Sequence, residues 1–203
     1  MAVATVWTSG SGNGLRSVDM PQVFINIIGH NASGKTTIAK RLADRFALNR
    51  ITGDEFRNFV YTHIPYFFGT DVSYPSRKSS EFNPLGGKYR LELSLVLLRA
   101  GQNVINDGSG STREIRQMYL QKIKTEFPQV KTVIVWANLP EEDLLERIKK
   151  RTQEENGRWE SMYHQFKKKA FEPPTEEEAD VLLHYNQLNY EEIEQRVKEL
   201  LGL

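Results

Sequence analysis

Short apolar runs alternate along the chain with longer segments in which apolar residues recur at helical spacing. A short apolar run predicts a buried β-strand, and apolar residues three or four positions apart predict a helix with one buried face. The predicted strands cover residues 23–28, 50–53, 103–106, 131–136 and 181–185. The predicted helices cover residues 38–48, 88–100, 112–127, 140–151, 158–170 and 189–201, with a helix or turn at 56–60. Strands that alternate with helices indicate an α/β domain built on a parallel, doubly wound sheet.

Capping residues mark the ends of several of these helices. Thr112 is the predicted N-cap of one helix, Gly101 ends the helix before it, and Pro140 lies near the first position of another. Two pairs have the spacing of a capping box and predict a short turn and the start of the C-terminal helix: Thr175 with Glu178, and Asn189 with Glu192.

Two stretches fall outside this alternation. Residues 1–22 contain repeated Gly and Ser and little periodicity, so we expect a flexible N-terminal extension. Residues 61–83 carry aromatic side chains among prolines and polar residues, which is typical of an insertion packed over the core or of a wall that faces a substrate. Residues 23–203 show no internal repeat, and we expect them to form a single domain.

Composition narrows the class of protein. The 203 residues include 27 Lys and Arg against 26 Asp and Glu, so the overall charge neither favours nor excludes a nucleic-acid partner. The chain has no Cys and therefore no disulfide or zinc–thiolate site. No apolar run approaches the roughly 20 residues that span a bilayer, and the N-terminus lacks the apolar core of a signal peptide. We therefore expect a soluble, cytoplasmic protein without a membrane partner.

One stretch fits the phosphate-binding pattern G-x-x-x-x-G-K-[ST], and it reads GHNASGKTT over residues 29–37. A predicted strand precedes it and a predicted helix follows it, which is the context that distinguishes a phosphate-binding loop from a chance match. The residues expected to bind the nucleotide are Gly29, His30, Asn31, Ala32, Ser33, Gly34, Lys35, Thr36 and Thr37.

The chemistry of the loop explains its spacing. Gly29 and Gly34 permit a tight turn, so that successive N–H groups can point at phosphate oxygens beside the positive end of a helix. Lys35 can reach the β- and γ-phosphates, and the Thr36 hydroxyl can bind Mg²⁺. The sequence therefore predicts ATP and Mg²⁺ as cofactors.

A kinase also needs a carboxylate that orients the acceptor hydroxyl and a second acid near the metal. Asp54 follows the second strand, and Arg57 lies on the same helical face three residues later. Asp54 is then a general base beside Arg57, or alternatively a helix N-cap beside a surface arginine. Asp107 ends the third strand, where it is either the acid close to Mg²⁺ or a turn residue before Gly108.

Mobile cations are the third requirement, because charge develops on the transferred phosphoryl group. Arg147 and Arg151 lie four residues apart on one helix, before a polar loop, so they either belong to a lid over residues 147–160 or form a solvated basic face. Lys167–Lys169 is either a solvated face or a contact to a phosphate backbone. Trp136 and Trp159 are expected to be packing residues.

Together these pieces resemble the P-loop kinases of the phage-type polynucleotide 5′-hydroxyl kinase group. The resemblance covers residues 23–186 and rests on the phosphate-binding loop, on GDEFR after the second strand and on VINDGSGSTREIR after the third. It also rests on LPEEDLLERIKKR in the lid and on WESMYHQF and FEPPTEEEAD downstream. The aromatic segment 61–83 departs from the group where the acceptor would enter.

The resemblance implies a P-loop kinase fold with a five-stranded parallel sheet in the order 2-3-1-4-5, helices on both faces and a lid. Asp54 would be the general base, Arg57 would hold a substrate phosphate, and Lys35 with Arg151 would stabilise the transferred phosphoryl group. Thr36 would bind the metal, Asp107 would support Mg²⁺ or Arg57, and Arg147 would lie near the nucleotide.

The sequence thus predicts an ATP- and Mg²⁺-dependent phosphotransferase whose acceptor is a hydroxyl of a nucleic acid or nucleotide. The alternatives are a kinase of a nucleoside, a sugar or an antibiotic, and a kinase of hydroxymethylated bases in DNA. A nucleotide-binding switch without an acceptor is the rival from another class. A GTPase is disfavoured, because no N-K-x-D sequence is present to bind guanine.

Overall fold

A five-stranded, fully parallel sheet forms the centre of the protein. The computed structural model describes residues 21–63, 79–108, 110–154, 171–186 and 188–203. The strands are β1 (Val23–Gly29), β2 (Asn49–Thr52), β3 (Val104–Asp107), β4 (Lys131–Ala137) and β5 (Val181–Tyr185). Their order in the sheet is β2-β3-β1-β4-β5, which confirms the predicted topology.

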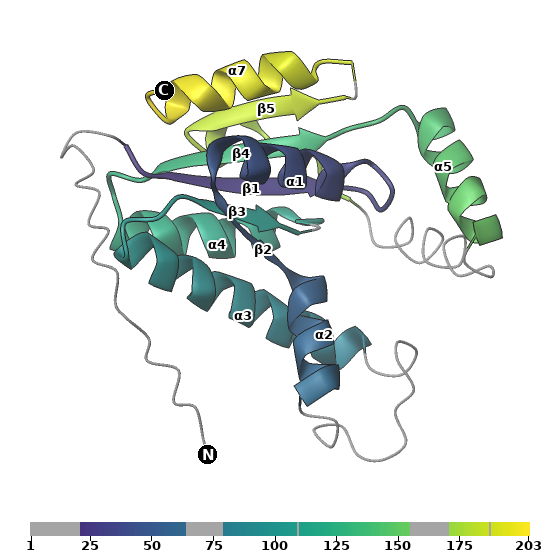
Figure 1. The fold of residues 1–203 in the computed structure, drawn as a ribbon, viewed down its shortest axis with the longest axis horizontal. Coiled ribbons are helices and arrows are strands. Elements are labelled where there is room, and N and C mark those ends of the chain that lie inside the picture. Colours follow the sequence, from purple (N-terminus) through teal and green to yellow (C-terminus); the bar gives the residue numbers. More distant parts are fainter. Residues whose placement is uncertain (1–20, 64–78, 109, 155–170, 187) are drawn as a thin grey trace, which may run out of the picture.

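Helices cover both faces of the sheet (Figure 1). On one face, α1 (Lys35–Phe46) and α7 (Tyr190–Leu200) pack on alternate residues of β1 and β4, such as Ile25 and Val133. On the other, α3 (Ser79–Arg99) and α4 (Arg113–Glu126) pack on the intervening residues, such as Phe24 and Ile134. Burial on both faces explains why the predicted strands are continuous apolar runs.

Two helices project from the end of the sheet at which the strands finish (Figure 1). Helix α2 (Gly53–His63) follows β2 directly, and α5 (Glu141–Glu154) follows β4 after a short connection. This carboxyl edge is where ligands bind in open α/β sheets.

Several element boundaries differ from the sequence predictions, including those of α2 and α3. Gly53 begins α2 instead of ending the second strand, and α3 begins at Ser79 instead of residue 88. Gly86 and Gly87 are weak helix formers, but contacts with other elements hold this turn of helix. The Tyr119 hydroxyl donates to the Gly87 carbonyl oxygen at 2.7 Å, so tertiary packing overrides local propensity here.

The predicted caps are confirmed in two places and wrong in a third. The Thr112 hydroxyl accepts from the Ile115 N–H, and Thr175 forms a capping box with Glu178 before the 3₁₀ turn η1 (Glu176–Glu178). Asn189 does precede α7, but its side chain makes no cap hydrogen bond. Its amide group instead donates to the His184 carbonyl and accepts from the Asn186 N–H, which closes the turn after β5.

Several predicted features lie outside the described residues. They are the N-terminal extension as far as residue 20, the middle of the aromatic segment at 64–78, the helix at 158–170, Trp159 and Lys167–Lys169. Within the described residues, no helix is both long enough and apolar enough to cross a membrane.

Candidate active site

The carboxyl ends of three neighbouring strands bring the candidate residues to one edge of the sheet. Ile27 of β1 is the register partner of Asp107 in β3, and Asp107 is in turn the partner of Thr52 in β2. Thr52 and Ile27 are therefore two strand spacings apart, or roughly 10 Å. The phosphate-binding loop begins just after Ile27, and Asp54 follows Thr52, so the two predicted reactive regions face the same edge.

The backbone of the loop has a conformation that its sequence explains. Gly29 has φ 141° and Gly34 has φ 95°, both in the region that favours glycine. A Cβ atom at Gly29 would collide with the carbonyl oxygen of Ala137, at the end of β4. Ala32 also takes a positive φ, of 64°, which is uncommon for a residue with a side chain. The loop is thus folded tightly against the end of the sheet.

The start of α1 offers hydrogen-bond donors to an anion. Its N-cap is Gly34, which has no side chain to cap the helix, and its first turn contains no acidic residue. The first N–H groups of a helix have no partner within that helix. In addition, Asn31 Nδ2 and Ser33 Oγ are buried without a hydrogen-bond partner among the described residues. Buried polar groups normally have partners, so these atoms and the helix N-terminus fit the oxygens of a polyphosphate.

The predicted cofactor residues of α1 occupy its first turn. Lys35 Nζ donates to the carbonyl oxygen of His30 at 2.6 Å, so the lysine reaches back across the loop. Thr36 and Thr37 are exposed beside it. No group of three or more His, Asp or Glu side chains within the described residues could hold a metal ion. A Mg²⁺ ion held by phosphate oxygens and the Thr36 hydroxyl would fit this arrangement.

Helix α5 packs against the same loop. Leu144 and Ile148 are buried with Ala32 in a small apolar cluster. This packing places Arg147 beside the loop, where its Nη1 atom lies 3.5 Å from the Ala32 carbonyl oxygen. Arg147 thus lies beside the phosphate-binding loop, and its place near a nucleotide stays a prediction. Arg151 lies in α5 one turn further on, and its side chain is outside the described residues, as is the predicted lid beyond residue 154.

Asp54 and Arg57 are brought together as predicted. They form an ion pair through Asp54 Oδ1 and Arg57 Nη2, and the Asp54 side chain is 74% exposed. The N-cap interaction is made by another residue, because the Thr52 hydroxyl accepts from the Glu55 N–H at 3.0 Å. Asp54 is therefore not needed as a cap, and its carboxylate is available to a ligand at the edge of the sheet.

Asp107 has a partner that the sequence did not predict. Its buried carboxylate accepts from Arg50 Nε at 3.1 Å, and Arg50 also pairs with Glu55 through Nη1. Arg50 of β2 is the register partner of Ile105, two residues before Asp107, so both side chains lie on one face of the sheet. Support of Arg57 by Asp107 is not among the contacts of the described residues, and its role near Mg²⁺ stays a prediction.

Arg90 is a site residue that the sequence analysis missed. It comes from α3, and its Nη1 atom donates to Asn106 Oδ1 at 3.3 Å and to the Asp107 carbonyl oxygen at 3.4 Å. Its Nε atom donates to the Gly86 carbonyl oxygen at 3.3 Å. No feature of the linear sequence links residue 90 to the end of the third strand.

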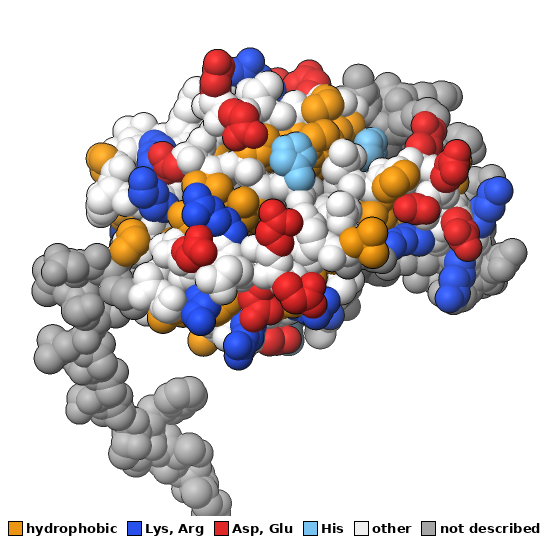
Figure 2. Space-filling model, turned by 90° about the horizontal axis from the view of Figure 1, so that it is seen from above, with side chains coloured by type: hydrophobic (Ala, Val, Ile, Leu, Met, Phe, Trp, Pro, Cys, Tyr) orange, Lys and Arg blue, Asp and Glu red, His pale blue; other side chains and the backbone are white. Residues whose placement is uncertain are grey.

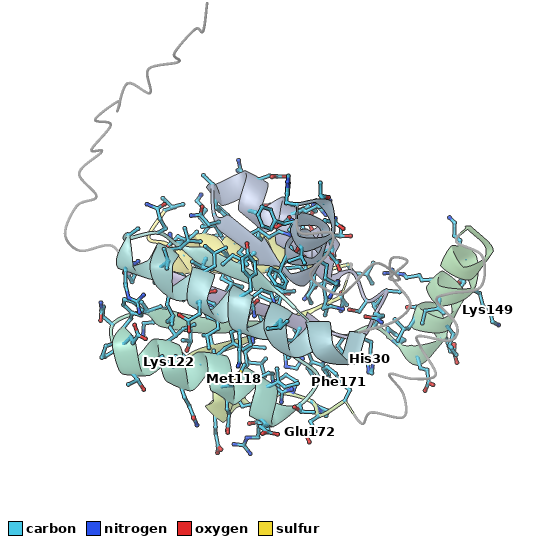
Figure 3. All side chains as sticks on the ribbon, turned by 90° about the horizontal axis from the view of Figure 1, so that it is seen from below. His30, Met118, Lys122, Lys149, Phe171 and Glu172 are labelled. Carbon is cyan, nitrogen blue, oxygen red and sulfur yellow. The ribbon has the colours of Figure 1, made fainter. Side chains whose placement is uncertain are left out.

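The rings of His30, Phe171 and Trp136 form an aromatic cluster at the phosphate-binding loop. The His30 ring lies 4.7 Å from the Phe171 ring, which stacks on Trp136 at 6.2 Å, and His30 and Phe171 are adjacent in Figure 3. Trp136 also packs against the core, as predicted. Burial and then the nearby Lys35 charge lower the pKa of His30, which favours the neutral form of its ring beside the loop.

A buried ion pair fixes the segment that carries Phe171. Arg116 and Glu178 are fully buried and joined by two hydrogen bonds, of 2.6 and 2.8 Å. Arg116 also donates to the carbonyl oxygens of Gly110 and Glu172. Burial alone would raise the pKa of Glu178, but the hydrogen bonds from Arg116 and the Thr175 N–H hold this pKa below its usual value. Residues 171–178 are thereby attached to the turn after β3.

Comparisons with known proteins agree with this architecture. The model of a family described as AAA domain matches residues 24–174. None of the curated proteins matches the chain. A solved protein from Chloroflexus aurantiacus, whose description proposes a kinase, is 19% identical with a TM-score of 0.70, over 91% of this chain and 98% of that chain.

Two further solved structures are similar in fold. A sugar kinase from Janibacter sp. is 20% identical with a TM-score of 0.58, over 90% of this chain and 95% of its own. The APS kinase of Mycobacterium tuberculosis, in complex with AMPPNP and APS, is 14% identical with a TM-score of 0.58, over 91% of this chain and 99% of its own. These likenesses confirm the expected P-loop kinase fold. The narrower resemblance to phage-type polynucleotide kinases stays a prediction.

Proposed function

The chain belongs to the AAA domain family and has a P-loop kinase fold, and from this premise we propose that it transfers the γ-phosphoryl group of ATP to a hydroxyl. The observation that carries the proposal is the shared edge of the sheet. It places an anion-binding loop and an exposed carboxylate, Asp54, after strands that are two spacings apart. A phosphate donor and a hydroxyl acceptor need this juxtaposition.

In the proposed transfer, different residues bind the nucleotide, accept the proton and supply positive charge. The phosphate-binding loop and Lys35 hold the polyphosphate, and Mg²⁺ bound there with Thr36 would neutralise charge on the phosphate oxygens. Asp54 accepts the proton of the acceptor hydroxyl while that oxygen bonds to the γ-phosphorus and the bond to the ADP oxygen breaks. Arg147 contributes positive charge beside the loop, and Arg151 follows one turn later in α5.

The surroundings of Asp54 favour a small acceptor over a polynucleotide. A nucleic-acid track requires several Lys or Arg side chains that follow a phosphate backbone. In the described parts of α2 and α3, the exposed side chains include Glu55, Phe59 and Tyr89 as well as Lys88, so acidic and aromatic residues interrupt the basic ones. On the α7 side of the molecule, the face shown in Figure 2, charges of both signs are interspersed. Sugar kinase and APS kinase neighbours have small acceptors, in agreement with this view.

The test is transfer of label from γ-labelled ATP with Mg²⁺ to a panel of acceptors. The panel contains sugars, sugar acids and nucleosides, 5′-hydroxyl and 5′-phosphorylated oligonucleotides, and DNA with hydroxymethyl bases. We expect label on a small molecule. Label on 5′-hydroxyl ends alone would replace the small acceptor with the polynucleotide that the sequence predicted, and label on internal bases would indicate a kinase of modified DNA. No transfer to any member would contradict the kinase proposal.

A further inference from the structure

Helix α2 carries Asp54, and the ion pair that Asp54 makes lies wholly within that helix. Asp54 pairs with Arg57 one turn later, and a contact between two residues of one helix does not fix that helix on the sheet. The Phe56 ring stacks on Tyr89 at 4.6 Å and attaches α2 to α3. Because α2 projects from the edge of the sheet (Figure 1), the position of its first turn depends on further contacts.

Arg50 of β2 joins the first turn of α2 to the end of β3. Its Nε atom donates to Asp107 Oδ2 at 3.1 Å, and its Nη1 atom donates to Glu55 Oε1, also at 3.1 Å. One planar guanidinium group therefore bridges two carboxylates that come from different elements. The Arg50 side chain is 16% exposed and that of Asp107 is 5% exposed, so salt screens this pair less than a surface pair.

Glu55 is held through both its backbone and its side chain. Its N–H group donates to the Thr52 hydroxyl at 3.0 Å, and its carboxylate accepts from Arg50. Thr52 is the last residue of β2 and Arg50 lies two positions before it, so both contacts attach Glu55 to the same strand. Asp54 is the residue directly before Glu55, and its backbone is therefore held between the end of β2 and a fixed neighbour.

Asp107 connects this bridge with the phosphate-binding loop. Asp107 is the register partner of Ile27 in β1, two residues before the loop begins at Gly29. Ile27 and Ile105 pack with α1 on this face of the sheet. Arg50 thus fixes the start of α2 against the strand beside β1, so the distance from Asp54 to the loop depends on the bridge.

We propose that Arg50 is a positioning residue for the phosphoryl transfer: by bridging Asp107 and Glu55, it holds Asp54 where the acceptor hydroxyl is deprotonated. The inference rests on the proposed kinase function and adds a residue to it. Arg50 acts through Glu55 and not by contact with the nucleotide or the acceptor. A displacement of about 1 Å at a reacting group can lower a rate about 100-fold, so loss of the bridge affects kcat.

Steady-state kinetics separate this role from a role in nucleotide binding. Each protein is assayed with γ-labelled ATP, Mg²⁺ and the acceptor that takes up label in the panel. We expect Arg50→Gln to lower kcat about 10- to 100-fold, with KM for ATP and the affinity for Mg²⁺ and AMPPNP unchanged. Arg50→Lys should restore part of kcat, because one ammonium group keeps the charge but cannot occupy both guanidinium positions. Arg45→Gln is the matched control, since Arg45 pairs with Glu194 at the surface.

A variant at the exposed end of the bridge keeps the test independent of folding. The Glu55 side chain is 57% exposed, so Glu55→Gln should fold normally and still lower kcat. The double variant of Arg50→Gln with Glu55→Gln should lower kcat no further than Arg50→Gln alone, because both changes break one bridge. An unchanged kcat in Arg50→Gln, additive losses in the double variant, or a loss of transfer explained by weaker binding of Mg²⁺ and AMPPNP would each overturn the positioning role.

Hydrogen exchange measures the bridge without turnover. With Mg²⁺ and AMPPNP bound, the amides of residues 54–57 should exchange faster in Arg50→Gln than in wild type, while those of α7 are unchanged. Transfer by wild type, with equal exchange and equal kcat in Arg50→Gln, would refute this inference while the kinase function stands. Faster exchange in Arg50→Gln, with no transfer by wild type to any acceptor, would refute the kinase function and leave the bridge.

Discussion

Several residues of the phosphate-binding loop have polar groups without a hydrogen-bond partner among the described residues. Asn31 and Ser33 bury polar atoms that have no protein partner among the described residues, and Gly34 leaves the start of α1 without a side-chain cap. Each polar group without a partner lowers the stability of the folded chain unless a ligand supplies the missing hydrogen bond. The loop sequence predicted the ligand class, but it did not predict which of its side chains would be buried.

The first residue-scale prediction concerns Lys35. Lys35→Met removes the charge that reaches back over the loop and keeps an unbranched side chain of similar length. We expect kcat to fall by about 100- to 1000-fold, as for the loss of one group that stabilises developing charge. The unfolding temperature should change little, and Lys40→Met, exposed on the same helix, is the control. An unchanged kcat would contradict the assignment of Lys35.

The second residue-scale prediction concerns Glu178, the buried partner of Arg116. Glu178→Gln leaves Arg116 buried without a counter-charge, so we expect a loss of about 3–5 kcal/mol in the free energy of unfolding. Urea denaturation at pH 7 measures the loss, with the exposed neighbour Glu177→Gln as control.

The same pair predicts a pH dependence. The pKa of Glu178 is held below its unfolded value of about 4.5, so its stabilising effect is complete above that pH. The effect disappears as the pH falls through the lower, folded-state pKa. The difference in stability between wild type and Glu178→Gln should therefore shrink on acidification. A difference that stays constant down to pH 3 would show that the ion pair is not its source.

The helices and strands that were predicted correctly are those whose signals lie in the local sequence. The apolar strands and the helix after the loop follow from spacing, and Thr112 caps its helix as its sequence suggests. The predicted start of α3 at residue 88 was too late, because packing against Tyr119 and α2 maintains helix at Gly86 and Gly87. The predicted capping box at Asn189 was wrong, because its side chain closes the preceding turn. Arg116 with Glu178, 62 residues apart, and Arg90 with Asn106 depend on tertiary proximity that spacing does not encode.

The element-scale prediction concerns the contact between α5 and the loop. Leu144→Ala removes apolar packing on Ala32, and we expect unfolding to become easier by about 2–3 kcal/mol, the lower part of the range for buried leucines. Because the same contact positions Arg147, KM for ATP should rise. Leu188→Ala, at a side chain that is 93% exposed, should affect neither quantity. If Leu144→Ala lowers stability with no effect on nucleotide affinity, α5 does not position Arg147.

At the scale of the whole molecule, strand order determines where chemistry can occur. The order β2-β3-β1-β4-β5 places the strand before Asp54 two positions from the strand before the loop, with β3 and Asp107 between them. Helices on both faces bury the rest of the sheet, so its carboxyl edge is the part left for ligands (Figure 1). The alternation of strands and helices predicted the parallel, doubly wound sheet, and the family resemblance predicted its strand order. The acceptor could not be predicted, because the residues around the end of β2 come from α2, α3 and the turn after β3, and only tertiary packing brings them together.

The central claim is that the nucleotide serves transfer to an acceptor held by Asp54, and one comparison tests it most directly. Wild type and Asp54→Asn are assayed with the acceptor that the panel identifies, for phosphoryl transfer and for binding of Mg²⁺ and AMPPNP. We predict that Asp54→Asn lowers kcat for transfer about 100- to 10,000-fold, as for a lost general base, with nucleotide affinity unchanged. Equal turnover in the two proteins would contradict the claim and favour a nucleotide-dependent switch.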